Sequence, residues 1–265
     1  MSAKTATSTT PLGVYCSYMK RRVKKQILPA LAVAALALSA TLLFTSSTTA
    51  PGSTVRPSPT ATPKASAKTT ATPTPTATPL PSSAQLVVPF LVQAPFGIWD
   101  PLHEDACEET SLMMVRHFYE KTTFTREEGD AEITEFVRYQ EARGYGVSIS
   151  LQDLNMFAKM FYNMDTGRIV TIKSVDDIKK EIAAGRPVIV GAAGKELENK
   201  NFSNGGPVYH MLVITGYDAR GFITNDPGVS QGEDFRYSYD NLYNAIHNWD
   251  PTDIKKGAKE LLVFD

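Results

Sequence analysis

A change of composition near residue 84 decides which part of this 265-residue chain can form a globular fold. Residues 46–83 consist almost entirely of Ser, Thr, Ala, Pro and Gly, with no aromatic or acidic residue. Such a segment cannot bury enough apolar surface to offset the entropy of the chain. We therefore expect residues 45–83 to form a disordered stalk, up to ~100 Å long when extended. Residues 84–265 then form one domain of ordinary size.

An uncharged apolar run precedes this stalk. Residues 27–44 are about as long as a helix that crosses the hydrocarbon core of a membrane. Five basic residues lie just before the run, within residues 20–25, and the next positive charge after it is Arg56. This asymmetry keeps residues 1–26 in the cytoplasm. We expect a single-pass cell-membrane protein with a signal anchor at residues 27–44 and an extracellular C-terminal domain. A signal peptide cleaved near Thr49 and Ala50 is the alternative.

Charge and ligand spacing narrow the range of partners. Residues 1–83 carry nine Lys or Arg and no acid, which leaves 18 basic against 28 acidic residues in the domain. A domain about ten charges negative is a poor match for nucleic acid. No group of Cys and His has the spacing of metal ligands, so we expect no metal and no cofactor. We also expect a monomer.

The hydrophobic pattern of the domain predicts helices first and a sheet second. Residues 85–96 are β-branched and apolar around a proline, which is typical of an edge strand that leads into a loop. Helices are predicted at residues 107–121, 126–142, 150–162 and 175–185, and a short one at 238–247. The third and fourth have the capping pairs Ser150 with Asp153 and Ser174 with Asp177. Antiparallel strands are predicted at residues 187–192, 209–217, 221–225 and 260–264. This order predicts an α+β class.

Cys107 is the only cysteine of the domain, so the domain has no internal disulfide. A free thiol in an exported domain indicates chemistry. Cys107 opens the predicted helix at 107–121, where the helix dipole lowers a thiol pKa. Nucleophilic cysteine catalysis also needs a histidine, a group that orients it and donors for the oxyanion. His210 and Asp226 follow Cys107 in that order. The other cysteine, Cys16, lies on the expected cytoplasmic side.

Three sequence blocks support this interpretation: VPFLVQAPF at residues 88–96, DACEETSLMM at 105–114 and YHMLVITGYDARGFITNDPG at 209–228. They resemble the bacteriocin-processing (double-glycine-leader) peptidase-like family of papain-like cysteine peptidases. The resemblance implies a papain-like fold, with the nucleophile in the helical part and the histidine and aspartate in the sheet. It also implies roles for four residues: Cys107 as nucleophile, His210 as general base and acid, Asp226 as orienting group and Gln93 as oxyanion-hole side chain.

The chain departs from the family at two places. The family often has Gly-Cys-Gly-Pro around its nucleophile, whereas residues 106–109 are Ala-Cys-Glu-Glu. Gln93 lies fourteen residues before Cys107, a wider gap than is usual in papain-like enzymes. Carboxylates that faced the sulfur would raise the thiol pKa. We expect the four nearby acids to face solvent or a cationic group of the substrate: Glu104, Asp105, Glu108 and Glu109.

The sequence therefore predicts a membrane-tethered extracellular cysteine peptidase that cleaves peptide or isopeptide bonds in a polypeptide or a cell-wall peptide. Two alternatives remain open at this point: transglutaminase-like acyl transfer, which differs only in the acceptor, and an inactive papain-like module that binds peptides. We predict that His103, His117 and His247 are not catalytic. The aromatic residues of the helices are predicted to be core rather than a ligand platform: Phe118, Tyr119, Phe157 and Phe161.

Overall fold

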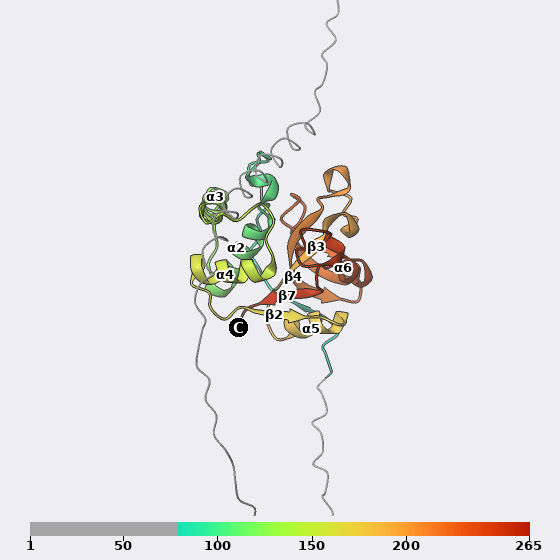
Figure 1. The fold of residues 1–265 in the computed structure, drawn as a ribbon. Coiled ribbons are helices and arrows are strands. Elements are labelled where there is room, and N and C mark those ends of the chain that lie inside the picture. The colour runs from blue at the N-terminus through green and yellow to red at the C-terminus, as the bar shows by residue number, and fades with distance from the viewer. Residues whose placement is uncertain (1–78) are drawn as a thin grey trace, which may run out of the picture. The chain divides into compact units, whose positions relative to one another are not determined.

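The computed structural model describes residues 79–265, in which three helices precede most of the sheet (Figure 1). They are α2 (Cys107–Glu120), α3 (Arg126–Glu141) and α4 (Leu151–Tyr162), and a short 3-10 helix, η1 (His103–Asp105), leads into α2. Two further helices follow later, α5 (Val175–Ala183) and α6 (Tyr239–Ala245). No helix in this part of the chain is long and apolar enough to cross a membrane. The predicted anchor at residues 27–44, and all but the end of the predicted stalk, lie outside the described residues.

One antiparallel sheet occupies the second half of the domain. Its strands are β1 (Ala84–Gln85), β2 (Arg168–Thr171), β3 (Val188–Ala193), β4 (Tyr209–Asp218), β5 (Gly221–Asn225), β6 (Phe235–Tyr237) and β7 (Glu260–Val263). The order is β2-β7-β3-β4-β5-β6, and β1 pairs with the far end of β4. The register places His210 opposite Ala192 and Val213 opposite Asn225. The predicted α+β class, with helices first and an antiparallel sheet second, is confirmed.

The two faces of the sheet pack against different helices because side chains alternate along a strand. Ile189, Met211 and Val213 belong to a core that includes residues of α2 and α4. Their neighbours Val190 and Leu212 belong to a second core, with residues of α5 and α6. Figure 1 shows the same division, with α2, α3 and α4 on one side of the strands and α6 on the other. Cys107 lies in the first core.

The helix boundaries follow the capping signals in the sequence. Ser150 caps α4 and forms a capping box with Asp153, as predicted. Lys121 ends α2 in the left-handed conformation (φ 55°), and its N–H is bonded to carbonyls of the last turn. The predicted aromatic core is confirmed: Phe157 is fully buried, and the others pack around the same cluster. These contacts fix α2, and with it Cys107, against the sheet.

The predicted edge strand that leads into a loop at residues 85–96 is present, but the strand is shorter than expected. Only Ala84–Gln85 pairs as a strand, and the N–H of Leu86 still reaches Thr215 O. The segment then continues without regular structure, because its prolines lack the N–H that a ladder requires. Side chains satisfy part of its backbone instead, as Asn225 Nδ2 donates to Val88 O at 3.0 Å. The sequence pattern also missed the short strands β2 and β6.

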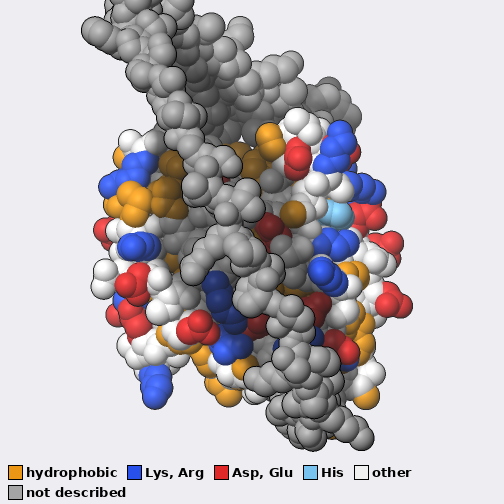
Figure 2. Space-filling view, turned by 60° about the horizontal axis from the view of Figure 1, so that its bottom comes forward, with side chains coloured by type: hydrophobic (Ala, Val, Ile, Leu, Met, Phe, Trp, Pro, Cys, Tyr) orange, Lys and Arg blue, Asp and Glu red, His pale blue; other side chains and the backbone are white. Residues whose placement is uncertain are grey.

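The surface carries both signs of charge. On the face shown in Figure 2, the coloured Lys and Arg side chains are interspersed with Asp and Glu side chains. Both signs of charge are therefore present among the side chains that are visible on this face.

Candidate active site

Cys107 is the first residue of α2, as the sequence predicts. Its side chain is almost completely buried, with a relative exposure of 6%. The thiol lies beside the backbone N–H of Met211 on β4, whose hydrogen bond favours the thiolate. Met211 follows His210 directly in the chain. The fold thus brings the sulfur to the start of the strand that carries the predicted histidine.

His210 and Asp226 form a buried pair. His210 Nε2 donates to Asp226 Oδ1 at 2.7 Å, and both side chains are nearly inaccessible. The pairing follows from the sheet. His210 is the second residue of β4, and Asp226 comes directly after β5, the strand that pairs antiparallel with β4. With Nε2 bonded to the carboxylate, Nδ1 is the ring nitrogen that can exchange a proton with a nucleophile. This is the arrangement that orients a catalytic imidazole.

Three further donors hold the Asp226 carboxylate. Its Oδ1 also accepts from the Gly228 N–H at 3.0 Å. Its Oδ2 accepts from the Tyr237 hydroxyl at 2.6 Å and from Asn199 Nδ2 at 3.1 Å. Burial raises the Asp226 pKa, but His210, Tyr237 and Gly228 together hold it below its ordinary value. Asp226 is therefore an anion that stays ionised at neutral pH.

Sequence reasoning missed Asn199, Gly228 and Tyr237. Asn199 and Tyr237 come from distant segments, and no motif links them to Asp226. Gly228 carried a signal within the NDPG turn, because a Cβ there would lie 2.8 Å from His210 Cε1. Only glycine allows the backbone to approach the ring this closely.

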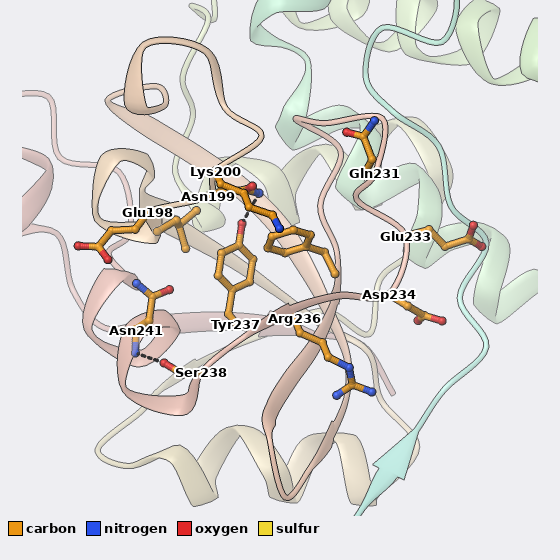
Figure 3. Close-up of a pocket in the computed structure, with 12 residues that line it drawn as sticks. Glu198, Asn199, Lys200, Gln231, Glu233, Asp234, Arg236, Tyr237, Ser238 and Asn241 are labelled. Carbon is orange, nitrogen blue, oxygen red and sulfur yellow. Dashed lines mark hydrogen bonds between the residues drawn. The ribbon is translucent and has the colours of Figure 1, made fainter.

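An open hollow of about 680 Å³ lies behind this carboxylate (Figure 3). Asn199 and Tyr237 line it, and Figure 3 shows the hydrogen bond between them. Lys200 and Arg236 also contribute, together with Glu198 and other polar side chains. Neither Cys107 nor His210 is among the lining residues. The hollow thus meets the site only through the two residues that hold Asp226 Oδ2.

Gln93 binds the backbone of η1, the short 3-10 helix that leads into Cys107. Its Nε2 donates to His103 O at 2.8 Å and to Glu104 O at 3.0 Å, both in η1. Its backbone N–H donates to Pro227 O at 2.9 Å. Gln93 therefore joins the turn before Cys107 to the turn after Asp226. Since both Nε2 hydrogens are used, this geometry does not favour an oxyanion-hole role, which stays a prediction.

Glu108 and Glu109 are buried, so the expectation that they face solvent or substrate is wrong. Glu108 is 1% exposed and Glu109 is 4% exposed. Glu109 Oε1 accepts from Gln140 Nε2 at 2.8 Å, and Glu108 Oε1 accepts from the Ile149 N–H at 3.3 Å. The first two turns of α2 are buried all round, so polar character there does not indicate exposure. Glu104, by contrast, is exposed as expected.

The thiol pKa is raised, which also differs from the sequence prediction. Burial is the largest cause, followed by the charge of Glu108 and the hydrogen bond in which Cys107 Sγ donates to Glu108 Oε2 at 3.0 Å. Burial likewise raises the Glu108 pKa to about 7. The position at the helix N-terminus is confirmed, but in this environment burial and a carboxylate outweigh the helix dipole.

These buried acids predict an unusual dependence of stability on pH. Burial and the charge of Glu108 raise the folded-state pKa of Glu109 well above its ordinary value. An acid with a raised folded pKa stabilises the fold at low pH, and this contribution is lost as pH rises through the folded pKa. Glu109→Gln removes this pH-dependent cost. We therefore expect the variant's free energy of unfolding, relative to that of the wild type, to be higher at pH 8 than at pH 5 by at least about 1 kcal/mol. Urea unfolding of both proteins at the two pH values measures this, and equal pH dependence would contradict it.

The other histidines have partners of their own. His103 lies between Asp100 and Asp130, His117 contacts Glu132 and Thr122, and His247 Nδ1 lies 2.9 Å from Gly257 O. No group of three or more His, Cys, Asp and Glu within residues 79–265 could hold a metal ion.

Comparison with known proteins matches the chain to one family model and finds similar solved structures. Residues 85–254 match the model of the Peptidase_C39 like family. No curated protein matches the chain. A solved structure described as a C39-like peptidase from Bacillus anthracis is 18% identical, with a TM-score of 0.46, and covers 70% of this chain and 98% of its own. The family match includes Gln93, Cys107, His210 and Asp226, and it is to the broad family rather than to the double-glycine-leader group.

Proposed function

This chain belongs to the Peptidase_C39 like family, and we propose that it is a cysteine peptidase that hydrolyses peptide or isopeptide bonds. The observation that carries the proposal is the buried His210–Asp226 pair. The Cys107 thiol lies beside the backbone N–H of Met211, the residue that follows His210 in β4. Nucleophile, base and orienting group are the parts that acyl transfer through a thioester requires.

The proposed reaction has two halves. The Cys107 thiol passes its proton to His210 Nδ1 as the sulfur attacks the scissile carbonyl, and His210 then gives that proton to the leaving amine as the C–N bond breaks. A thioester with Cys107 remains. Water then adds to this thioester with His210 as base, and the carboxylic acid product leaves the sulfur. The backbone N–H groups at the start of α2 are suited to the developing oxyanion. Asp226 keeps the imidazole oriented and stabilises its charged form.

An inactive peptide-binding module is the second candidate. The observation that favours it is the raised thiol pKa, because a buried thiol that donates to a carboxylate is a poor nucleophile in the resting state. The intact His210–Asp226 pair favours the peptidase, because a binding module has no need to orient an imidazole.

A peptide pool tests the two candidates directly. The full-length protein, in mild detergent and under reducing conditions, is incubated with a diverse set of peptides, and new termini are identified by mass spectrometry. A peptidase produces new C-termini, and added hydroxylamine converts some of them to hydroxamates through the thioester. Binding of peptides without any new terminus would overturn the proposal in favour of the binding module.

We further propose that the domain acts outside the cell, held by a membrane anchor at residues 27–44 through the segment at 45–83. The apolar run with five basic residues before it supports this orientation. The substrates would then be extracellular polypeptides or cell-wall peptides. Protease treatment of intact cells should digest an epitope placed after Asp265, and protection of that epitope would contradict the orientation.

A further inference from the structure

The nucleophile has a second ionisable partner that neither the family resemblance nor the proposed triad includes. Glu108 Oε2 lies 3.0 Å from Cys107 Sγ and accepts its proton in a hydrogen bond. The Ile149 N–H holds the other carboxylate oxygen. A carboxyl group bonded on both sides and almost without exposed surface cannot turn away without leaving a buried N–H unpaired. The contact is therefore built into the fold.

The charges around Glu108 come from every element that packs there. Asp105 and Glu109 are the nearby acids in the segment that carries Cys107, and both disfavour a second negative charge. Tyr209 on β4 is close enough for its pKa to be raised by Glu108 and Cys107, after the larger effect of burial. The Cys107 thiol, as hydrogen-bond donor, and the backbone N–H groups of Glu108 and Ile149 favour the Glu108 carboxylate. The backbone N–H of Met211 favours the Cys107 thiolate. In this setting one negative charge fits, and two would repel each other.

We propose that Glu108 restrains Cys107 in the free enzyme: its carboxylate accepts the hydrogen bond of the thiol, and its charge keeps the proton on the sulfur. This inference rests on the proposed role of Cys107. The restraint ends when Glu108 takes up a proton from solvent; the S–H proton then passes to His210 Nδ1, which leaves a thiolate beside a neutral carboxyl. In that form the carboxyl O–H donates to the sulfur and stabilises it. In the resting form the carboxylate holds the thiol, and the free enzyme is restrained.

Site-resolved alkylation tests the proposal. The rate at which iodoacetamide labels Cys107 is measured between pH 6 and 10 in the full-length protein by peptide mass spectrometry, with Cys16 as a reference thiol in the same chain. In Glu108→Gln the negative charge is removed and an amide N–H can donate to the thiolate. A thiol pKa lowered by one unit gives about ten times more thiolate. We therefore expect Cys107 to label at least about tenfold faster at pH 7 in Glu108→Gln than in the wild type.

Glu109→Gln is the matched control, because it removes an equally buried charge without a contact to the sulfur. Its effect on labelling should stay below about threefold, since the charge of Glu109 is the smallest of the main influences on the thiol. Glu108→Ala gives a second variant in which labelling should also accelerate. Equal or slower labelling of Cys107 in both Glu108 variants, with the fold intact by circular dichroism, would overturn the proposal.

The outcome is separate from that of the proposed function. Alkylation measures the sulfur alone, so faster labelling in Glu108→Gln supports the inference even if no peptide is cleaved. Conversely, a wild type that cleaves peptides, with labelling unaffected by Glu108, would remove this inference and leave the peptidase intact.

Discussion

Replacement of Cys107 by alanine is expected to abolish peptide cleavage, with a loss of at least about 10³-fold in kcat/KM on any peptide that the wild type cuts. The reason is chemical, because without the sulfur no thioester forms. The buried position is apolar in character, and alanine removes one polar hydrogen bond to Glu108, so the fold should persist.

Cys16→Ala is the control for this variant, because it removes the only other thiol of the chain. Its cleavage rate should match that of the wild type. Hydroxamate formation should also vanish in Cys107→Ala and persist in Cys16→Ala. Cleavage that survives in Cys107→Ala would mean that the activity belongs to another site.

Asp226→Asn carries the second large expected effect, a loss of about 10² to 10⁴-fold in kcat. All four hydrogen bonds at this carboxylate are donated to it. An amide NH₂ placed at Oδ2 would face the Asn199 NH₂ group, and placed at Oδ1 it would face the Gly228 N–H. Either orientation leaves an unpaired donor, and neither supplies a negative charge for the imidazolium.

The measurement is steady-state kinetics on a cleaved peptide, with KM separated from kcat. A loss in kcat with little change in KM indicates that the imidazole has lost its orienting group. Asp218→Asn is the control, because Asp218 lies at the opposite end of β4 from His210 and pairs with Arg220 and Arg236. A similar loss in both variants, or none in Asp226→Asn, would contradict the assignment.

Local signals made most of the fold predictable. Ser150 and Asp153 fixed the start of α4, and the runs of β-branched residues located β3, β4 and β5. β2 and β6 have only four and three residues. Such short strands depend on the strands that they pair with, which explains why the sequence pattern missed them. Prolines explain why the strand at the start of residues 85–96 gives way so early to a loop, because their effect on pairing exceeds the β propensity of the neighbouring residues.

The candidate site was predictable where one continuous motif carried it. The block that contains His210 and Asp226 folds as a hairpin, so sequence spacing determines their contact. The surroundings of the sulfur depend on tertiary burial. Glu108 and Glu109 are typical of an exposed first helical turn, yet α2 is enclosed by other elements. The direction of the Cys107 pKa shift followed from that enclosure and could not be predicted from spacing.

The most direct test of the central claim is covalent capture of Cys107 by a peptide with a C-terminal electrophile, such as an acyloxymethyl ketone. The full-length wild type and His210→Ala are treated at pH 7 under reducing conditions, and adducts at Cys107 and Cys16 are quantified by mass spectrometry. If Cys107, His210 and Asp226 form a peptidase site, the adduct forms on Cys107 in preference to Cys16 and falls at least about 10²-fold in His210→Ala. Equal labelling of the two cysteines, or labelling of Cys107 unchanged in His210→Ala, would contradict the account.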